Sequence, residues 1–224
     1  MELLEAARGD RYEALYVLCL TSGRRQGGTL GLKRSDVDLD TDTLRVNRQL
    51  QRVRRQGGKS GSLAFSEPKN ASRRAVGLPP RAVRTLEEHS ERQLEDKRGA
   101  GHEWQETTLV LTNSKGKPLE AQNVVNRSFK SLLGRAGLPP IRFHGLRYSC
   151  LSLLASRGEP IRDLQAIAGR SSGEDKRTTL LTGGSTVAVN GPSSSPGSFL
   201  TLYFLAANQR KIEVAGPGFE PGTP

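Results

Sequence analysis

The sequence has few cysteines, few aromatic residues and no long apolar run. Aromatic residues make up 5% of the 224 positions, and the two cysteines, Cys19 and Cys150, lie in apolar segments without metal-ligand spacing. Both are predicted core residues of a protein in a reducing compartment. No apolar run is long enough for a membrane span, and a charged amphipathic stretch follows Met1 in place of a signal peptide, which predicts a cytoplasmic protein.

Basic residues are in clear excess. Lysine and arginine number 34 against 23 acidic residues, which gives a net charge of +11. An excess of this size concerns partners more than fold, and nucleic acid is the favoured polyanion. An anionic membrane is disfavoured because no long helix has a basic face opposite an aromatic one. A solvated basic surface that only keeps the chain soluble is the remaining alternative.

The apolar spacing predicts a mainly helical α+β domain with a small antiparallel sheet. Asp10 is a possible cap before a second segment of the first helix, and Gly137 is a good C-terminal stop. The helix that Pro80 begins has few apolar residues and is expected at the surface. Helices are expected over residues 1–20, a short stretch ending near Lys33, 80–98, 122–136, 143–156 and 161–168, and strands within 37–53, 63–65, 74–78 and 109–112.

The composition changes after Ser172. Residues 183–198 are rich in glycine, serine and proline, and residues 216–224 are rich in glycine and proline. Neither segment has the periodicity of a packed element. We therefore expect one domain over residues 1–172 and a disordered tail over residues 173–224.

Several basic residues are spaced as a phosphate site would need. His144 and Arg147 lie three residues apart at the start of a helix, which places them on one face. A guanidinium is a bidentate phosphate donor, and an imidazole beside it can give or take a proton. Arg24 and Arg25 follow an apolar helix, and Lys69 lies between two expected strands. Taken alone, His144 with Arg147 is also typical of a capping histidine beside a surface arginine, and Arg24, Arg25 and Lys69 are also typical of solvated residues.

Three segments, taken in order, carry more information than their parts. They are TSGRRQGGTLGLKRSDVDLDTDTLRV, SEPKNASRRAVGLP and IRFHGLRYSCLSLLASRGEPIRDLQAIAGRSS. Together with their flanks they resemble the successive signature segments of tyrosine recombinases of the phage integrase family, over roughly residues 2–172. The resemblance implies the catalytic-domain fold of that family and site-specific DNA recombination through a phosphotyrosine intermediate.

The resemblance also implies roles for individual residues. Arg25 matches the first catalytic arginine, and His144 with Arg147 matches the H-x-x-R segment. Lys69 matches the lysine that protonates the leaving 5′ oxygen, and Arg170 stands, as a weaker match, where the family usually has His or Trp. Two arginines would clamp the scissile phosphate without a metal, so no cofactor and no metal is expected.

The sequence departs from the family pattern at several of these segments. Arg24 replaces an apolar residue, Gly28 replaces an acid, and Gly145 replaces a common aspartate. The turn after Lys69 is one residue short. Arg170 differs from the usual His or Trp in length and in its planar head.

The tyrosine nucleophile is not identified. The family places it about ten residues after the segment of Arg170, near Leu180, where this chain has no tyrosine. Tyr203 lies much too far along, and Tyr148 occupies a position that the family uses for packing. Without an activated hydroxyl no covalent intermediate forms, so this chain is expected to be catalytically inactive.

A shifted reading frame near codon 172 explains the loss of resemblance best. Residues 218–221 (Gly-Phe-Glu-Pro) can be encoded by GGG-TTC-GAA-CCC, which resembles the T-arm of a transfer RNA gene, beside which such integrases often lie. The helical core-binding domain that usually precedes the catalytic domain is also expected to be absent. Sequencing the locus around codons 165–224 would test the frameshift.

Three functions remain open. The first is a recombinase by descent, acting on double-stranded DNA attachment sites and on other recombinase protomers, with its activity lost. The second is a non-catalytic DNA-binding remnant that occupies sites or dimerises with an intact recombinase. A generic basic RNA-binding protein is the third, and the ordered segments disfavour it.

Overall fold

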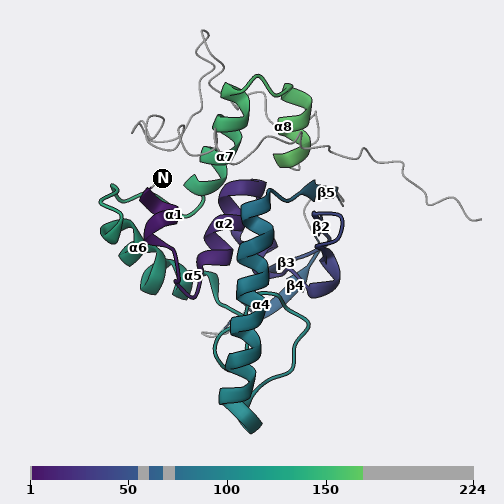
Figure 1. The fold of residues 1–224 in the computed structure, drawn as a ribbon, viewed down its shortest axis with the longest axis vertical. Helices are drawn as coiled ribbons and strands as arrows, with labels where there is room; N and C mark the ends of the chain where they lie inside the picture. The colour runs from purple at the N-terminus through teal and green to yellow at the C-terminus, as the bar shows by residue number, and fades with distance from the viewer. Residues whose placement is uncertain (1, 55–60, 68–73, 169–224) are drawn as a thin grey trace, which may run out of the picture.

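The computed structural model describes residues 2–54, 61–67 and 74–168. The expected mainly helical α+β class is confirmed (Figure 1). The helices are α1 Glu2–Ala6, α2 Glu13–Ser22, α3 Gln26–Leu30, α4 Pro80–Ala100, α5 Ala121–Val124, a π-helical segment Val125–Phe129, α6 Lys130–Arg135, α7 Gly145–Ser156 and α8 Ile161–Ala168, with 3₁₀ turns at Arg34–Asp36 and Gly101–Glu103. The strands are β1 Val37–Asp38, β2 Thr43–Val46, β3 Gln49–Arg54, β4 Gly61–Ser66 and β5 Arg74–Gly77.

Helix α2 forms the centre of the core. All ten of its residues are buried, and it packs against α4 on one side and α7 on another (Figure 1). Its apolar sequence, EALYVLCLTS, has no outward polar face, as expected of a helix surrounded by protein. It ends at Gly23, whose φ of +58° is a left-handed conformation that favours glycine.

The two cysteines are core residues, as predicted. Cys19 and Cys150 are 1% and 0% exposed and are free thiols. Burial raises the pKa of Cys19 to about 11 and that of Cys150 to about 12. Both thiols therefore stay protonated at neutral pH and behave as small apolar groups.

The first expected helix, over residues 1–20, is two helices. The Asp10 side chain accepts a hydrogen bond from the Tyr12 amide at 2.9 Å, which forms a turn between α1 and α2. Arg92 donates to the Asp10 carbonyl and Arg135 to its carboxylate. The helical periodicity was correct, and the break lies at Asp10, the residue predicted to cap a second segment. One of these bonds is local, and the other two come from the distant helices α4 and α6.

The expected single sheet is two small antiparallel sheets. Strands β1, β2 and β5 form one, with Leu44 opposite Val76, and β3 pairs with β4 to form a hairpin, with Leu50 opposite Phe65. Residues 109–112, expected as a strand, form only isolated bridges, from Leu109 to Lys33 and from Thr112 to Pro118. The short run gives too few ladder hydrogen bonds for a strand.

Helix α4 lies at the surface as expected, yet its inner face is more polar than the periodicity indicated. Thr85, His89 and Gln93 are buried on that face beside the apolar Ala82 and Leu86. Thr85 donates to the Arg81 carbonyl, His89 to the Val110 carbonyl, and Gln93 to the Val110 carbonyl and the Thr112 hydroxyl. These hydrogen bonds lower the cost of burying the polar groups.

The later helices follow the sequence closely. Residues 121–135 are helical throughout, although the middle turn is π-helical, and Gly137 follows with φ of +64° as the predicted stop. Helices α7 and α8 pack on each other around a second apolar cluster, which includes Leu151, Leu164 and Ile167 (Figure 1, top). This pair of helices carries the H-x-x-R segment to the end of α2.

Candidate functional site

Arg25 lies at the surface immediately after the buried helix α2. It precedes α3 with an extended backbone, at φ −72° and ψ 143°, and its side chain is exposed. Within the described part of the chain its guanidinium makes no hydrogen bond and no ion pair. The cationic head is therefore presented to solvent, where it can bind an anion without first losing a protein partner.

Its neighbour Arg24 points the other way, into the protein. Arg24 is 2% exposed, and its Nη2 donates to the Gly28 carbonyl at 2.6 Å. A Cβ placed on Gly28 would lie 3.8 Å from that nitrogen, so the residue that replaces an acid leaves room beside the guanidinium. The buried arginine thus ties the loop before α3 to the helix itself. Sequence reasoning noted both departures but missed that they are in contact.

Arg147 joins three segments beneath this surface. It is 3% exposed, and its Nη1 donates to the Gly23 carbonyl and its Nη2 to the Ala168 carbonyl, each at 2.6 Å. Gly23 lies two residues before Arg25, and Ala168 is the last residue of α8. The structure therefore brings the H-x-x-R segment, the first arginine segment and the end of α8 together at one guanidinium.

His144 is exposed at the start of α7 and contacts Tyr148. Their rings meet edge to face, with centroids 5.0 Å apart and planes at 90°. Tyr148 is 37% exposed. The prediction of a packing position for this tyrosine is therefore only partly right, because it packs on His144 at the surface and not within the core.

The first amides of α7 are already used. Those of Gly145, Leu146 and Arg147 donate to the carbonyls three residues earlier, at 2.7, 3.2 and 3.2 Å. The helix start therefore does not offer these amides to an anion. A phosphate beside α7 must therefore be held by side chains, and His144 is exposed at this turn, as is Arg142.

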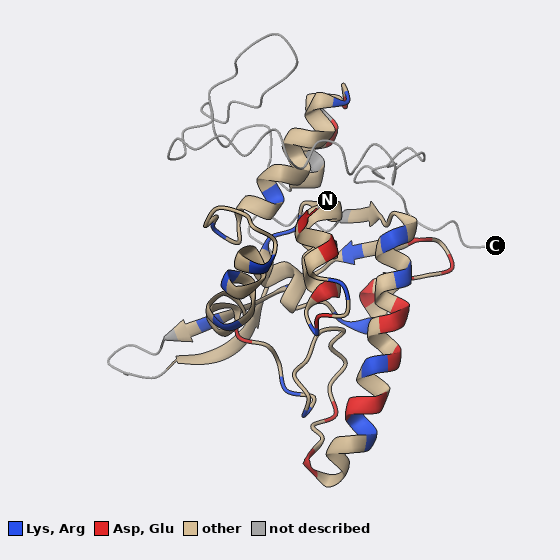
Figure 2. Cartoon of the chain, turned by 60° about the vertical axis from the view of Figure 1, so that its left-hand side comes forward, with Lys and Arg blue, Asp and Glu red and all other residues tan. Residues whose placement is uncertain are grey.

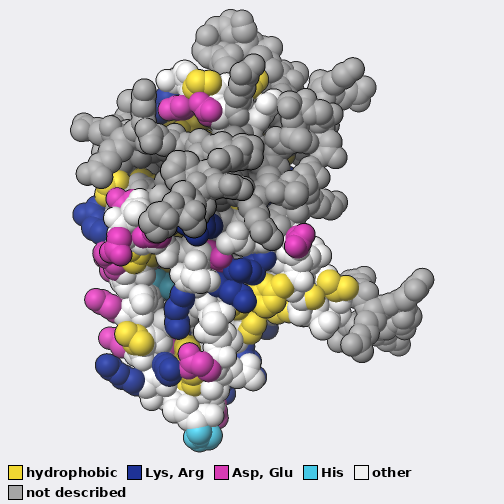
Figure 3. Space-filling view, turned by 90° about the vertical axis from the view of Figure 1, so that its right-hand side faces the viewer, with side chains coloured by type: hydrophobic (Ala, Val, Ile, Leu, Met, Phe, Trp, Pro, Cys, Tyr) yellow, Lys and Arg dark blue, Asp and Glu magenta, His cyan; other side chains and the backbone are white. Residues whose placement is uncertain are grey.

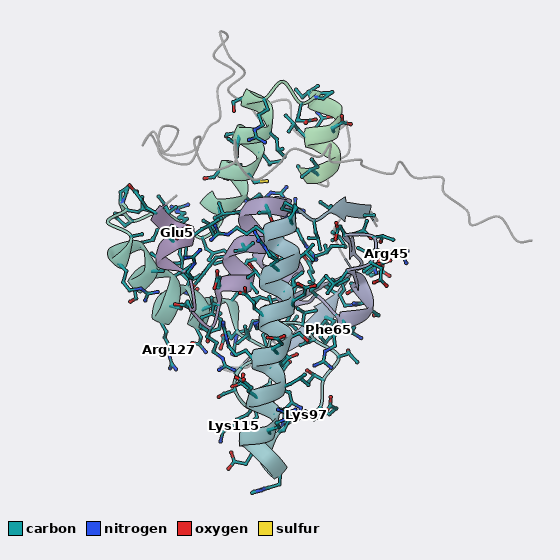
Figure 4. The ribbon with its side chains drawn as sticks, viewed as in Figure 1. Glu5, Arg45, Phe65, Lys97, Lys115 and Arg127 are labelled. Carbon is teal, nitrogen blue, oxygen red and sulfur yellow. The ribbon has the colours of Figure 1, made fainter. Side chains whose placement is uncertain are left out.

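A hairpin beyond this junction presents apolar and basic groups together. Val53 and Phe65 of β3 and β4 are 42% and 49% exposed, and the Lys33 ammonium lies 5.6 Å from the centre of the Phe65 ring. Arg52 forms an ion pair with Glu120 at 2.6 Å. Figure 3 shows basic side chains beside the apolar surface of the hairpin, and Figure 4 labels Phe65.

Charge elsewhere is mixed. Along α4 acidic and basic residues are interspersed (Figure 2). At its far end Lys97 pairs with Glu106, and Lys115 with Glu103 (Figure 4). Exposed pairs of this kind contribute little to stability and cancel each other's field. Arg25, which has no ion-pair partner among the described residues, differs in this respect from the charged side chains at the end of α4.

Two predicted site residues lie outside the described residues. They are Lys69 and Arg170. Tyr203, the position near Leu180 and the whole predicted tail also lie outside the described residues. Of the five predicted residues the structure describes Arg25, His144 and Arg147, as set out above. Within the described ranges no group of His, Cys, Asp and Glu side chains is arranged to hold a metal, and no helix is long and apolar enough to cross a membrane.

The sequence matches the model of the phage integrase family over residues 1–177. The chain belongs to the phage integrase family. A tyrosine recombinase XerC-like protein of Caldanaerobacter subterraneus subsp. tengcongensis is 33% identical over 178 residues, which are 76% of this chain and 45% of that protein. An integrase of Streptomyces ambofaciens is 39% identical over 103 residues, 45% of this chain and 26% of that integrase. The chain thus spans less than half the length of these curated relatives.

Solved structures of an integrase and of a recombinase show the same fold. The Tn1549 transposon integrase in complex with transposon right end DNA matches 76% of this chain and 55% of its own, with a TM-score of 0.60 and 20% identity. The XerA recombinase matches 76% of this chain and 53% of its own, with a TM-score of 0.57 and 22% identity. The expected catalytic-domain fold of tyrosine recombinases is therefore confirmed.

Proposed function

We propose that this chain binds double-stranded DNA and holds a phosphodiester against the exposed Arg25 and His144, above the buried Arg147, without forming a phosphotyrosine bond. The observation that carries the proposal is the pair of hydrogen bonds from Arg147. They connect the helix that begins after His144 to Gly23, two residues before Arg25. Family membership supports DNA recombination as the process in which the chain or its ancestor acts.

The three residues have different proposed roles, which follow from how exposed each side chain is. Arg25, exposed and free of protein partners within the described ranges, contacts a non-bridging oxygen of the phosphate. His144, also exposed, supplies a second donor or exchanges a proton. The buried Arg147 fixes the backbone beneath them and adds positive charge in a region of low dielectric, where charge acts more strongly.

Strand cleavage is a separate step and needs a nucleophile. A tyrosine hydroxyl would attack the phosphorus, and the 5′ oxygen would leave with a proton. The sequence has no tyrosine between Tyr148 and Tyr203, the interval in which the family places it. We infer that the chain binds DNA and does not cleave it, and that it can occupy sites beside intact recombinase protomers.

DNA binding is tested by fluorescence anisotropy with labelled duplex at several salt concentrations. Affinity should fall steeply as salt rises, because bound basic groups displace counterions. Arg25→Ala should weaken binding about tenfold, as expected for the loss of one close charge-assisted contact. Arg98→Ala is the matched control, because Arg98 is also exposed but lies at the end of α4 far from α7 (Figure 1).

A salt-independent affinity, or equal losses in the two variants, would refute the proposed site. Cleavage is tested with a nicked suicide substrate that traps covalent protein–DNA adducts. No adduct is expected. An adduct that maps to Tyr203 or Tyr148 would show that the chain cleaves DNA and would refute the proposed loss of activity.

A further inference from the structure

Tyr148 has a surface position that the core does not require. Helix α7 already buries Leu146, Cys150, Leu151 and Leu154 on its inner side. Tyr148 lies on the opposite side, and its hydroxyl makes no hydrogen bond to any residue within the described ranges. The packing of the core therefore does not require an aromatic ring at this partly exposed position, and a smaller residue would serve as well.

The ring contacts His144, which the proposed site uses. The two residues are four apart, so their side chains share one face of the helix. Their rings meet edge to face at 5.0 Å, within the range that favours aromatic pairs. An aromatic ring packed against the imidazole from one turn away excludes some of the χ1 and χ2 rotamers that the histidine could otherwise occupy.

We propose that Tyr148 is a positioning residue that orients the His144 imidazole for the DNA phosphate. The aromatic ring of Tyr148 performs this role, and its hydroxyl is dispensable. Arg147, between them in sequence, faces inward and anchors the same turn to Gly23 and Ala168. Arg147 thus anchors this turn of the helix from inside the protein. On the outside, Tyr148 packs against the exposed His144. Its consequence for DNA binding rests on the function proposed above.

The contact itself is tested without DNA. The chain has three histidines, so the full-length protein gives three ring C2–H signals by NMR, and His144→Gln identifies the signal of interest. Tyr148→Phe should leave that signal in place. Tyr148→Leu should shift it, because the ring current of the tyrosine is lost. The signal of buried His89 reports on the fold, and Ser152→Ala, one turn further along α7, is the control.

An unchanged His144 signal in Tyr148→Leu, with the fold intact, would overturn the proposal. So would a shift of equal size in Tyr148→Phe, which keeps the ring. Neither result depends on whether the wild-type chain binds DNA. The positioning role and the proposed function can therefore fail separately.

The consequence for DNA is tested by a double-mutant cycle in the anisotropy assay. Tyr148→Leu should weaken binding about two- to tenfold, the range expected for loss of one aromatic pair, and Tyr148→Phe should not. In the His144→Gln background Tyr148→Leu should have no further effect. An equal loss in both backgrounds would mean that Tyr148 acts independently of His144, which would overturn the inference.

Discussion

Two regions of this protein bury polar side chains against backbone carbonyls, and they do it with different chemistry. At the α2–α7–α8 junction the permanently charged Arg147 donates to Gly23 and Ala168. At the inner face of α4 the neutral Gln93 and His89 both contact the Val110 carbonyl, at 3.1 and 2.9 Å. The first region adjoins the proposed phosphate site and the second is remote from it in the fold (Figure 1).

The difference shows what each kind of group is suited to. A neutral amide costs less to bury, so it fastens α4 to residues 109–112 without placing charge in the core. A guanidinium costs more but keeps its charge at every physiological pH, which suits a region that must attract an anion. We therefore expect the junction to be sensitive to loss of charge, and the α4 face to be sensitive to loss of hydrogen bonds and to protonation.

Arg147→Met should give the largest effect. It leaves two buried carbonyls without their donor, and we expect the free energy of unfolding to fall by about 3 kcal/mol. Urea unfolding followed by far-UV circular dichroism measures this. Arg98→Met, at an exposed position of α4, should change stability by less than about 0.5 kcal/mol. If the two variants unfold at the same urea concentration, Arg147 is not the structural link between the segments.

Gln93→Leu should give an intermediate effect. The amide donates to the Val110 carbonyl and to the Thr112 hydroxyl at 2.8 Å, and it accepts a hydrogen bond from Arg34 at 2.7 Å. Replacing it removes these bonds, but the carbonyl keeps its contact with His89. We expect a loss of about 1–2 kcal/mol in the same unfolding experiment.

The exposed Gln122→Leu on α5 is the control for Gln93→Leu. DNA affinity should be unchanged in the Gln93 variant, because α4 is not part of the proposed phosphate site. A stability equal to that of the control, or a large loss of DNA affinity at full stability, would remove the distinction between the two regions.

The sequence predicted one of these regions better than the other. Helices α7 and α8 were predicted with boundaries close to those observed, because apolar spacing and the glycine and proline residues around them are strong local signals. The burial of Arg147 and Arg24 was not predicted, because apolar periodicity counts every arginine as polar. The carbonyl partner of Arg24 is only four residues away, at Gly28, whereas those of Arg147 lie 124 and 21 residues away. Those partners exist only once the chain has folded.

The polar inner face of α4 had a signal that was overlooked. Thr85, His89 and Gln93 recur every four residues and continue the stripe begun by Ala82 and Leu86. Neutral polar residues at helical spacing are compatible with a buried face when carbonyls lie opposite, but the sequence does not reveal the carbonyls. The same reasoning explains why the two small sheets were predicted as one: strand pairing depends on distant partners, whereas strand propensity is local.

The smallest expected effect is a pH dependence that only the α4 face should show. Burial lowers the pKa of His89 below its ordinary value of 6.5, and Arg92 and Arg11 lower it further, while Asp96 and the bond to Val110 oppose this. Because Nε2 donates to Val110, protonation adds a buried Nδ1–H that has no acceptor within the described ranges. Between the lowered pKa and 6.5 the unfolded chain binds more protons.

Stability should therefore be complete above pH 6.5 and should decline as the pH falls through the folded pKa of His89. Urea midpoints measured from pH 7.5 to pH 5.5 test this. His89→Gln keeps a neutral donor and should flatten the dependence, whereas His102→Gln, at an exposed histidine, should leave it as in the wild type. If the urea midpoint depends equally on pH in the wild type and in His89→Gln, protonation does not affect the α4 face any more than it affects the arginine junction. The two regions would then differ only in their hydrogen bonding.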